Sequence, residues 1–250
     1  MTRILKIGGS ILTDKSRELA ARPLEISRIA REISSQPDDL VLVHGAGSFG
    51  HIPARKYRLS QEFNREGLRV THNSVARLCE QVVQALGQAG VQSLPVHPLS
   101  CIQLHNGRIE SFFLKPIKLM LERGIVPVLH GDVAMDLARG AAIVSGDQLV
   151  TYLATALRAE VVAVGSNVDG VLVLGKPLQS ISRMDLPEFL STIGGSAGVD
   201  VTGGMRGKLL ELLDLADIGI ESVIFNAGIE GNIVQALKGE IVGTRIRRPK

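Results

Sequence analysis

Short runs of apolar residues alternate along the chain with longer segments in which apolar positions recur every three or four residues. The short runs are mostly apolar at every position, which is typical of parallel strands covered by helices on both faces. They predict strands at residues 4–7, 40–44, 92–96, 125–129, 160–164 and 222–226. The longer segments predict helices at residues 23–34, 68–89, 115–123, 147–158, 205–218 and 232–238.

This alternation of strands and helices predicts an α/β protein, a three-layer αβα sandwich with a mainly parallel central sheet. Residues 132–144 differ, because their pattern favours a hairpin with a turn at Arg139-Gly140. Residues 175–200 are rich in Gly, Ser and Pro, and we expect them to be loop-like. We expect a single domain over residues 1–250, with two lobes that meet near residue 145.

The composition narrows the function classes. The net charge of the 250 residues is only +3, and aromatic residues, on which nucleic-acid bases could stack, make up 3% without any Trp. We therefore expect no nucleic-acid partner. The two cysteines lack C-x-x-C spacing, which argues against a zinc site or a disulfide framework and is typical of the reducing cytoplasm. Apolar runs never reach 18 residues, so we expect no membrane span, and we assign no residue as a metal ligand.

Residues 45–50 read GAGSFG and satisfy the G-x-G-x-x-G pattern of dinucleotide-binding proteins. In those proteins the pattern follows the first strand, and an acidic residue ends the second strand about 20 residues later. Here the pattern follows the second predicted strand, and the acidic residues beyond it lie in a polar segment that does not resemble a strand. A dinucleotide site is therefore disfavoured. The segment TGGMRGKL also fails as a Walker P-loop, because Lys208 is followed by Leu209.

Four glycine turns are more informative than the dinucleotide-binding pattern or the incomplete Walker P-loop. They are KIGGS (6–10), HGAGSFGH (44–51), SGDQL (145–149) and TGGMRGK (202–208). Glycine allows consecutive backbone N–H groups to point at one anion, and a following helix adds its partial positive charge. Such turns at one edge of a parallel sheet would converge on a ligand that carries several phosphates, such as ATP together with an acceptor.

Three lysines lie beside these turns, and phosphoryl transfer needs cations where charge develops on the transferring oxygens. Lys6 and Lys15 flank the first turn, and Lys208 follows the fourth. Asp147, at a predicted helix start, could hold the lysines in place. Taken singly, Lys15 or Lys208 would be a solvated surface residue, and Asp147 would be an ordinary helix N-cap. Their positions beside separate glycine turns favour the phosphoryl-transfer interpretation.

The ordered set of motifs resembles the amino acid kinase superfamily and, within it, is similar to the isopentenyl phosphate kinases. The resemblance extends over the whole chain, through ILKIGGSILTDK, VLVHGAGSFGH, GIVPVLHGDV, VSGDQL, SNVDGVL, DVTGGMRGK and FNAGIEGNIVQALKGEIVGTRI. It implies the amino acid kinase-like fold and a homodimer, which the cysteine content leads us to expect in the cytoplasm. It also implies that ATP, with Mg²⁺, phosphorylates isopentenyl phosphate to isopentenyl diphosphate, in isoprenoid biosynthesis by a mevalonate pathway.

The resemblance also implies a division of labour, with an acceptor-binding lobe at about residues 1–145 and a nucleotide-binding lobe at about 146–250. The catalytic residues would be Lys6, Lys15, His51, Asp147 and Lys208. The nucleotide would be held by Lys6, Gly8, Gly9, Ser10, Gly47, Asp169, Gly203, Gly204 and Lys208. The phosphate of the acceptor would be held by Ala46, Gly50, His51 and Gly146.

His51 is the residue on which the substrate prediction depends, because an imidazole can donate a hydrogen bond to a phosphate and bear charge near neutral pH. Taken alone, it would be an ordinary loop histidine. Asn167 and Leu172 depart from the Asp and Tyr that family members often carry there. A kinase for another small phosphate or phosphonate, such as a fosfomycin kinase, remains an alternative, and so does a non-catalytic nucleotide-binding regulator.

The isoprenoid tail would need an apolar wall, for which the predicted helix at residues 68–89 is a candidate. Four apolar residues share one side of that helix: Val75, Leu78, Val82 and Val83. A stripe of this kind is more often part of the hydrophobic core.

Overall fold

A central sheet of eight strands runs through the computed structural model, which describes residues 2–173, 176–186, 204–240 and 242–249. Its strand order is β12-β14-β13-β9-β1-β2-β6-β3, and every neighbouring pair is parallel except β13 and β14. The strands are β1 (Arg3–Ile7), β2 (Leu40–His44), β3 (Ser93–Pro95), β6 (Val126–His130), β9 (Val161–Ser166), β12 (Ser180–Ile181), β13 (Ser222–Asn226) and β14 (Gly243–Ile246). The prediction of a mainly parallel sheet is confirmed.

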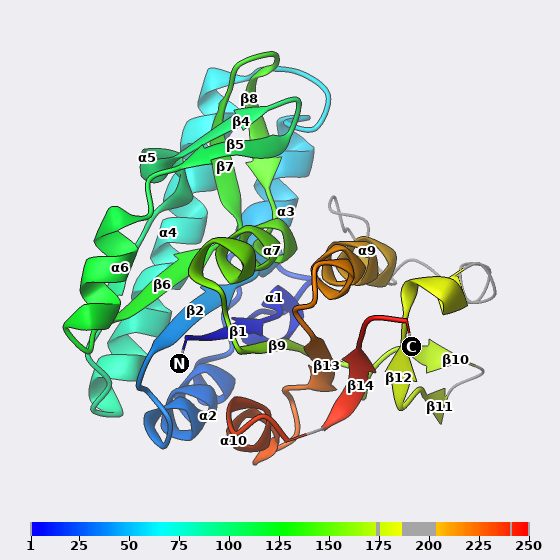
Figure 1. Ribbon diagram of the computed structural model, residues 1–250. Coiled ribbons are helices and arrows are strands. Elements are labelled where there is room, and N and C mark those ends of the chain that lie inside the picture. The colour runs from blue at the N-terminus through cyan, green and yellow to red at the C-terminus, as the bar shows by residue number, and fades with distance from the viewer. Residues whose placement is uncertain (1, 174–175, 187–203, 241, 250) are drawn as a thin grey trace.

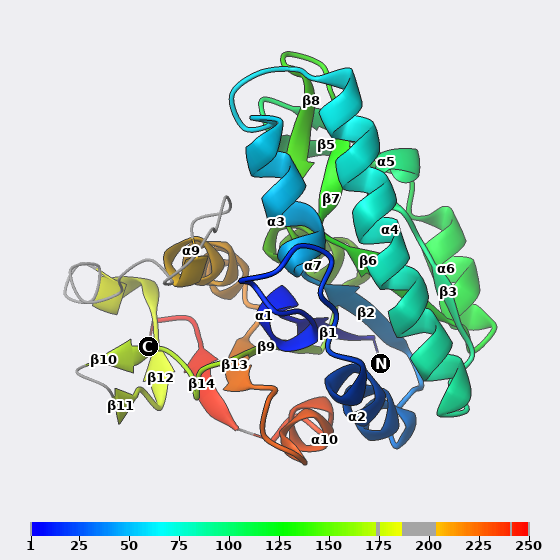
Figure 2. The ribbon, with the colours of Figure 1, turned by 180° about the vertical axis from the view of Figure 1, so that it is seen from behind.

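Helices cover both faces of this sheet (Figures 1 and 2). One face is covered by α6 (Lys115–Glu122), α7 (Gly146–Leu157) and α9 (Gly204–Asp217). The opposite face is covered by α2 (Pro23–Ser34), α4 (Arg65–Gln88) and α10 (Asn232–Leu237). The three-layer prediction is therefore confirmed, and each of these helices agrees with a predicted one to within three residues at either end.

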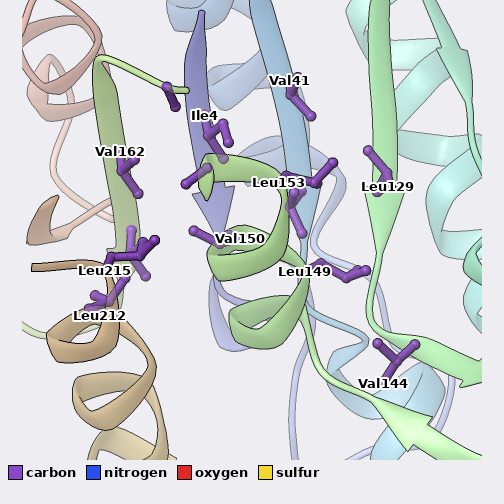
Figure 3. Packing of buried hydrophobic residues seen from close by; sticks show 14 of the residues in the cluster. Ile4, Val41, Leu129, Val144, Leu149, Val150, Leu153, Val162, Leu212 and Leu215 are labelled. Carbon is purple, nitrogen blue, oxygen red and sulfur yellow. The ribbon is translucent and has the colours of Figure 1, made fainter. Parts of the chain in front are cut away.

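Alternating side chains of the central strands build a separate core on each face. On β1, Ile4 packs in the cluster beneath α7 and α9, whereas Leu5 and Ile7 pack against α2 and α4. Figure 3 shows Ile4 of β1 and Leu153 of α7 among the buried residues of the first of these clusters. Each fully buried Leu or Ile of this kind stabilises the fold by roughly 1.5–3 kcal/mol relative to an exposed one.

A second, four-stranded sheet has the order β5-β4-β7-β8. Its strands are β4 (Ile102–His105), β5 (Arg108–Phe112), β7 (Asp132–Asp136) and β8 (Gly140–Val144), and the short helix α5 (Pro98–Cys101) precedes β4. The predicted hairpin is confirmed, with Asp136 paired to Gly140, whose φ is +77°. The Asp136 carboxylate joins both hairpin turns, because it accepts the backbone N–H groups of Gly107 (2.6 Å) and Arg139 (2.9 Å).

Two segments differ from the sequence-based expectation. The expected glycine turn at 44–51 continues into a helix, α3 (Gly47–Lys56), which contains Pro53, and the first turn leads into α1 (Gly9–Leu12). The segment 175–200 is not simply loop-like, because residues 176–186 include strands that pair with their neighbours; residues 187–203 lie outside the described residues. The short elements there are β10 (Leu172–Val173), β11 (Lys176–Pro177), β12 and the 3₁₀ helix η1 (Arg183–Asp185).

Within the described residues, every helix is too short or too polar to cross a membrane.

Candidate active site

The first two glycine turns lie in direct backbone contact at the carboxyl ends of β1 and β2. A Cβ atom on Gly9 would lie 2.3 Å from the backbone N of Gly47, and one on Gly45 would lie 2.5 Å from the N of Gly9. Gly47 also has a φ of +53°, which L-residues with side chains rarely adopt. The close approach requires glycine at all three positions and brings the N-termini of α1 and α3 together.

A cavity of about 320 Å³ opens at this edge of the sheet, where the first three glycine turns meet Gly204, Met205 and Lys208 of the fourth motif. The predicted site residues that line it are Lys6, Gly8, Gly9, Ser10, Lys15, Ala46, Gly47, Gly50, His51, Gly146, Asp147, Gly204 and Lys208. The structure thus brings together residues from β1, α3, α7 and α9. Asp169 lies between two lining residues without lining the cavity itself, and Gly203 lies outside the described residues.

The carboxylate of Asp147 holds two lysines at the floor of the cavity. The Nζ of Lys6 donates to Asp147 Oδ1 at 2.6 Å, and the Nζ of Lys208 lies 3.0 Å from Oδ1 and 3.3 Å from Oδ2. All three residues are less than 10% exposed. The carboxylate sits in the first turn of α7, where the helix dipole favours negative charge, and Ser145 caps that helix by accepting the N–H of Gln148. We call these three residues the lysine–aspartate triad.

The electrostatics of the triad favour an anionic ligand. Burial lowers the pKa of Lys6 from 10.5 to about 8; Asp147 opposes this change and Lys208 adds to it. Burial alone would raise the pKa of Asp147, but the ammonium groups of Lys208 and Lys6 outweigh it and hold that pKa below its usual value. At neutral pH the triad therefore carries two positive charges and one negative charge. The surplus positive charge faces the cavity, as a phosphate-binding site requires.

The cavity has an apolar end beyond the second glycine turn. Ala54 of α3, Val75 and Thr71 of α4, and Ile143 of β8 line it there. Of the four residues proposed as an apolar wall, only Val75 lines this cavity. Leu78 and Val82 belong to the buried core between α4 and the sheet, and Val83 packs partly buried against that core.

The opposite side of the cavity is formed by the C-terminal half of the chain. The hydroxyl of Ser10 donates to Asn167 Oδ1 at 3.3 Å, so Asn167, one of the two departures from the family pattern, contacts the first glycine turn. The other departure, Leu172, also lines the cavity. The Asp169 carboxylate accepts the side-chain N–H of Asn226 at 2.8 Å, which fixes it at the ends of β9 and β13.

The sequence analysis missed the contribution of β6 and β7. Gly131 and Asp132 line the cavity between the second and third glycine turns. A signal for them was present, because His130-Gly131 ends a buried strand just as His44-Gly45 does.

Comparison with known proteins agrees with this geometry. The model of the amino acid kinase family matches residues 1–226. The isopentenyl phosphate kinase of Methanothermobacter thermautotrophicus is 41% identical, over 97% of this chain and 98% of its own length. An X-ray structure of isopentenyl phosphate kinase superposes with a TM-score of 0.86 at 37% identity, over 98% of this chain and all of the other. A crystal structure of an isopentenyl phosphate kinase substrate complex gives a TM-score of 0.78 at 27% identity, over 98% and 99% of the two chains. The chain belongs to the amino acid kinase family and, within it, to the isopentenyl phosphate kinases.

Proposed function

We propose that this protein transfers the γ-phosphoryl group of ATP to isopentenyl phosphate and forms isopentenyl diphosphate, a precursor in isoprenoid biosynthesis by a mevalonate pathway. The observation that carries the proposal is a cavity with a cationic floor, the lysine–aspartate triad, and an apolar end at Ala54 and Val75. An acceptor with a phosphate head and a short hydrocarbon tail matches both ends. The names of the similar proteins support the same substrate.

The reaction is an in-line displacement at the γ-phosphorus. An oxygen of the acceptor phosphate forms the new P–O bond, the bond from the γ-phosphorus to the β,γ-bridging oxygen breaks, and ADP leaves. The attacking oxygen is already anionic, so no general base is required. Positioning and charge neutralisation therefore supply the rate enhancement.

The three lysines would neutralise the negative charge of different phosphate groups. Lys6 and Lys208 would contact the ATP phosphates, because Asp147 holds both at the cavity floor. Lys15 lines the cavity without belonging to the triad, and we assign it to the transferring phosphoryl group. The backbone of Gly8, Gly9, Ser10, Gly47, Gly203 and Gly204 would cradle the nucleotide, with Asp169 nearby.

The acceptor phosphate would lie on the other side of the second glycine turn. Ala46, Gly50 and Gly146 line the cavity beside His51, whose imidazole would donate to a phosphate oxygen. This arrangement supports the acceptor-binding role of residues 1–145. The nucleotide-binding role of residues 146–250 is supported by Lys208 and by the β9–β13 edge.

Mg²⁺ would enter with ATP. The two carboxylates that line the cavity in the described part of the chain are both engaged, Asp147 by two lysines and Asp132 by His72. Magnesium keeps several waters and readily binds through phosphate oxygens, so the nucleotide itself can supply its other ligands. Its role would be to neutralise charge on the transferring phosphates.

We also propose that the protein is a cytoplasmic homodimer. Strand β3 forms one edge of the main sheet, next to α4 and α6 (Figure 2). Leu94 of β3 and Leu119 of α6 are about half exposed, and Phe113, which precedes α6, is 63% exposed. A second copy could cover this edge, which light scattering would test. A site for ATP and two free cysteines support a cytoplasmic location.

The decisive experiment is an ADP-release assay with five acceptors in parallel: isopentenyl phosphate, dimethylallyl phosphate, fosfomycin, glutamate and UMP. We expect the highest kcat/KM with isopentenyl phosphate. His51→Ala should lose most activity while its KM for ATP stays within about threefold of the wild type. His105→Ala is the matched control, because His105 lies exposed on β4 and does not line the cavity. A preference for fosfomycin, or ATP binding without turnover of any acceptor, would contradict the proposal.

A further inference from the structure

Four of the six histidines gather beside the cavity, between the main sheet and α4. His44 ends β2, His130 ends β6, His97 follows β3, and His72 belongs to α4. The Nδ1 of His97 lies 2.8 Å from Nε2 of His130, and the rings of His44 and His130 stack with centroids 5.5 Å apart. The rings of His72 and His97 lie edge to face at 5.6 Å. The proposed function uses none of these four residues.

Three of the four imidazoles are neutral near pH 7. His44 and His130 each place Nδ1 about 3 Å from the carbonyl of the following glycine (3.1 and 3.2 Å). A carbonyl only accepts, so in each ring Nδ1 carries the proton and donates. Burial lowers the pKa of His44 to about 4 and that of His130 well below its usual value. Burial also lowers the pKa of His97.

His72 is the exception, because it faces a carboxylate. Its Nδ1 lies 2.9 Å from Asp132 Oδ2, and this hydrogen bond raises the pKa of His72. Burial raises the pKa of Asp132, and the bond to His72 opposes that rise. The hydrogen bond raises the pKa of His72 and lowers that of Asp132, so it favours the form in which an imidazolium faces a carboxylate. The Asp132 side chain is completely enclosed.

This pair adjoins the proposed acceptor site, because Asp132 is itself one of the residues that line the cavity. The preceding residue, Gly131, is in van der Waals contact with the second and third glycine turns, since a Cβ on it would lie 3.4 Å from the backbone N of Gly146 and 3.5 Å from that of Ala46. Those two residues belong to the proposed phosphate cradle. An enclosed carboxylate at this position acts through a medium of low dielectric, where its repulsion of a phosphate is strong unless a cation balances it.

We propose that His72 is a positioning residue for acceptor binding, because its hydrogen-bonded contact with Asp132 balances the enclosed carboxylate beside the phosphate cradle. The inference rests on the proposed function, since it takes the acceptor's phosphate to bind at Ala46 and Gly146. His72 does not line the cavity, so it acts through Asp132 and not by touching the substrate. The effect of its loss should fall on the acceptor far more than on ATP.

Two variants separate charge from structure. His72→Asn keeps a side-chain N–H donor for Asp132 but removes the positive charge, whereas His72→Asn combined with Asp132→Asn leaves a neutral pair. We expect His72→Asn to raise the KM for isopentenyl phosphate about tenfold, which corresponds to about 1.4 kcal/mol, and to change the KM for ATP less than twofold. The double variant should return the acceptor KM to within about twofold of wild type. His105→Asn is the control for histidine loss away from the cavity.

A purely structural role would give a different result, because the double variant would then be at least as impaired as the single one. Circular dichroism and thermal melting establish that each variant is folded, and His72→Gln serves as a second neutral donor if His72→Asn is not. An unchanged acceptor KM in a folded single variant, or no recovery in the folded double variant, overturns the inference. If the wild-type protein itself fails to phosphorylate isopentenyl phosphate, the proposed function fails instead.

Discussion

Replacing Asp147 by Asn should lower the free energy of unfolding by an amount that depends on pH, because Lys6 is buried and loses its counter-charge. The substitution keeps the shape of the side chain and one acceptor oxygen, but it removes the negative charge between two buried ammonium groups. Removing one partner of a buried ion pair costs about 3–5 kcal/mol when the remaining charge has to stay. Lys6 has an alternative, because it can release its proton.

The pKa of Lys6 limits what the substitution can cost through this residue. That pKa is about 8, so at pH 7 neutral Lys6 lies roughly 1 kcal/mol above the charged form in the wild-type protein. The variant can always use the neutral form. The loss through Lys6 should therefore be on the order of 1 kcal/mol at pH 7, larger at pH 6, and smaller at pH 8.

The sign follows from proton linkage. In the unfolded chain Lys6 titrates near 10.5. In the folded variant its pKa falls below 8, so between that pKa and pH 8 the unfolded state binds more protons and stability rises with pH. In the wild-type protein Lys6 is largely protonated in both the folded and the unfolded state below pH 8, so it adds almost no pH dependence to the stability there. The stability gap should therefore widen by up to about 1.4 kcal/mol per pH unit as the pH falls from 8 to 6; loss of the bond to Lys208 adds to the gap.

Urea unfolding of both proteins at pH 6, 7, 8 and 9 measures this gap, provided that the m-values agree. Asp214→Asn is the matched control. Its carboxylate pairs with Arg183 at the surface and is 57% exposed, so its loss should cost about 0–1 kcal/mol at each of these pH values. A gap for Asp147→Asn that stays constant within about 0.5 kcal/mol between pH 6 and 8 would refute the reasoning.

Three further predictions concern other parts of the molecule. Lys15→Ala should lower kcat by about 10²–10³-fold with the KM for ATP within about threefold, whereas steady-state kinetics showing mainly weaker ATP binding would contradict its assigned role. Gly47→Ala should lower the free energy of unfolding in urea by at least about 2 kcal/mol, because the new Cβ would lie 2.2 Å from Thr13 Oγ1 at a residue with a positive φ. Gly87→Ala is the comparison: no atom lies within 4 Å of its Cβ position, so it should stabilise α4 by about 0.5 kcal/mol. Burial raises the pKa of Cys79 to about 12, so its thiol should react with Ellman's reagent only upon unfolding; equal native and unfolded rates would exclude this.

The parallel strands could be predicted because a strand buried on both faces is an unbroken run of apolar residues. The large helices could be predicted because a helix buried on one face has apolar residues at every third or fourth position. Strands β4 and β5 gave no such signal, since IQLH and RIESF expose much of their length. Helix α3 was missed because its glycines and Pro53 disfavour a helix locally. Its packing against α4 overrides that preference.

The clustering of Lys6, Asp147 and Lys208 could be predicted because each of them adjoins a glycine-rich motif, and the structure brings all three into contact. Their roles stay predictions. His72 and Asp132 could not be paired from the sequence, since they are 60 residues apart and His72 lies in the middle of a helix. Only the packing of α4 against the sheet brings them into contact.

The backbone contact between the first two glycine turns also restricts how this protein can acquire new substrates. Gly9, Gly45 and Gly47 touch through main-chain atoms, so a side chain added on one loop cannot be accommodated by a smaller residue on the other. The apolar end differs, because Thr71 and Ile143 can exchange volume with their neighbours. Random libraries at the apolar end should therefore yield active variants that accept substrates with different hydrocarbon tails. Libraries at the glycine turns of the phosphate end should yield almost no active variants. The molecule is adaptable at one end of its cavity and fixed at the other.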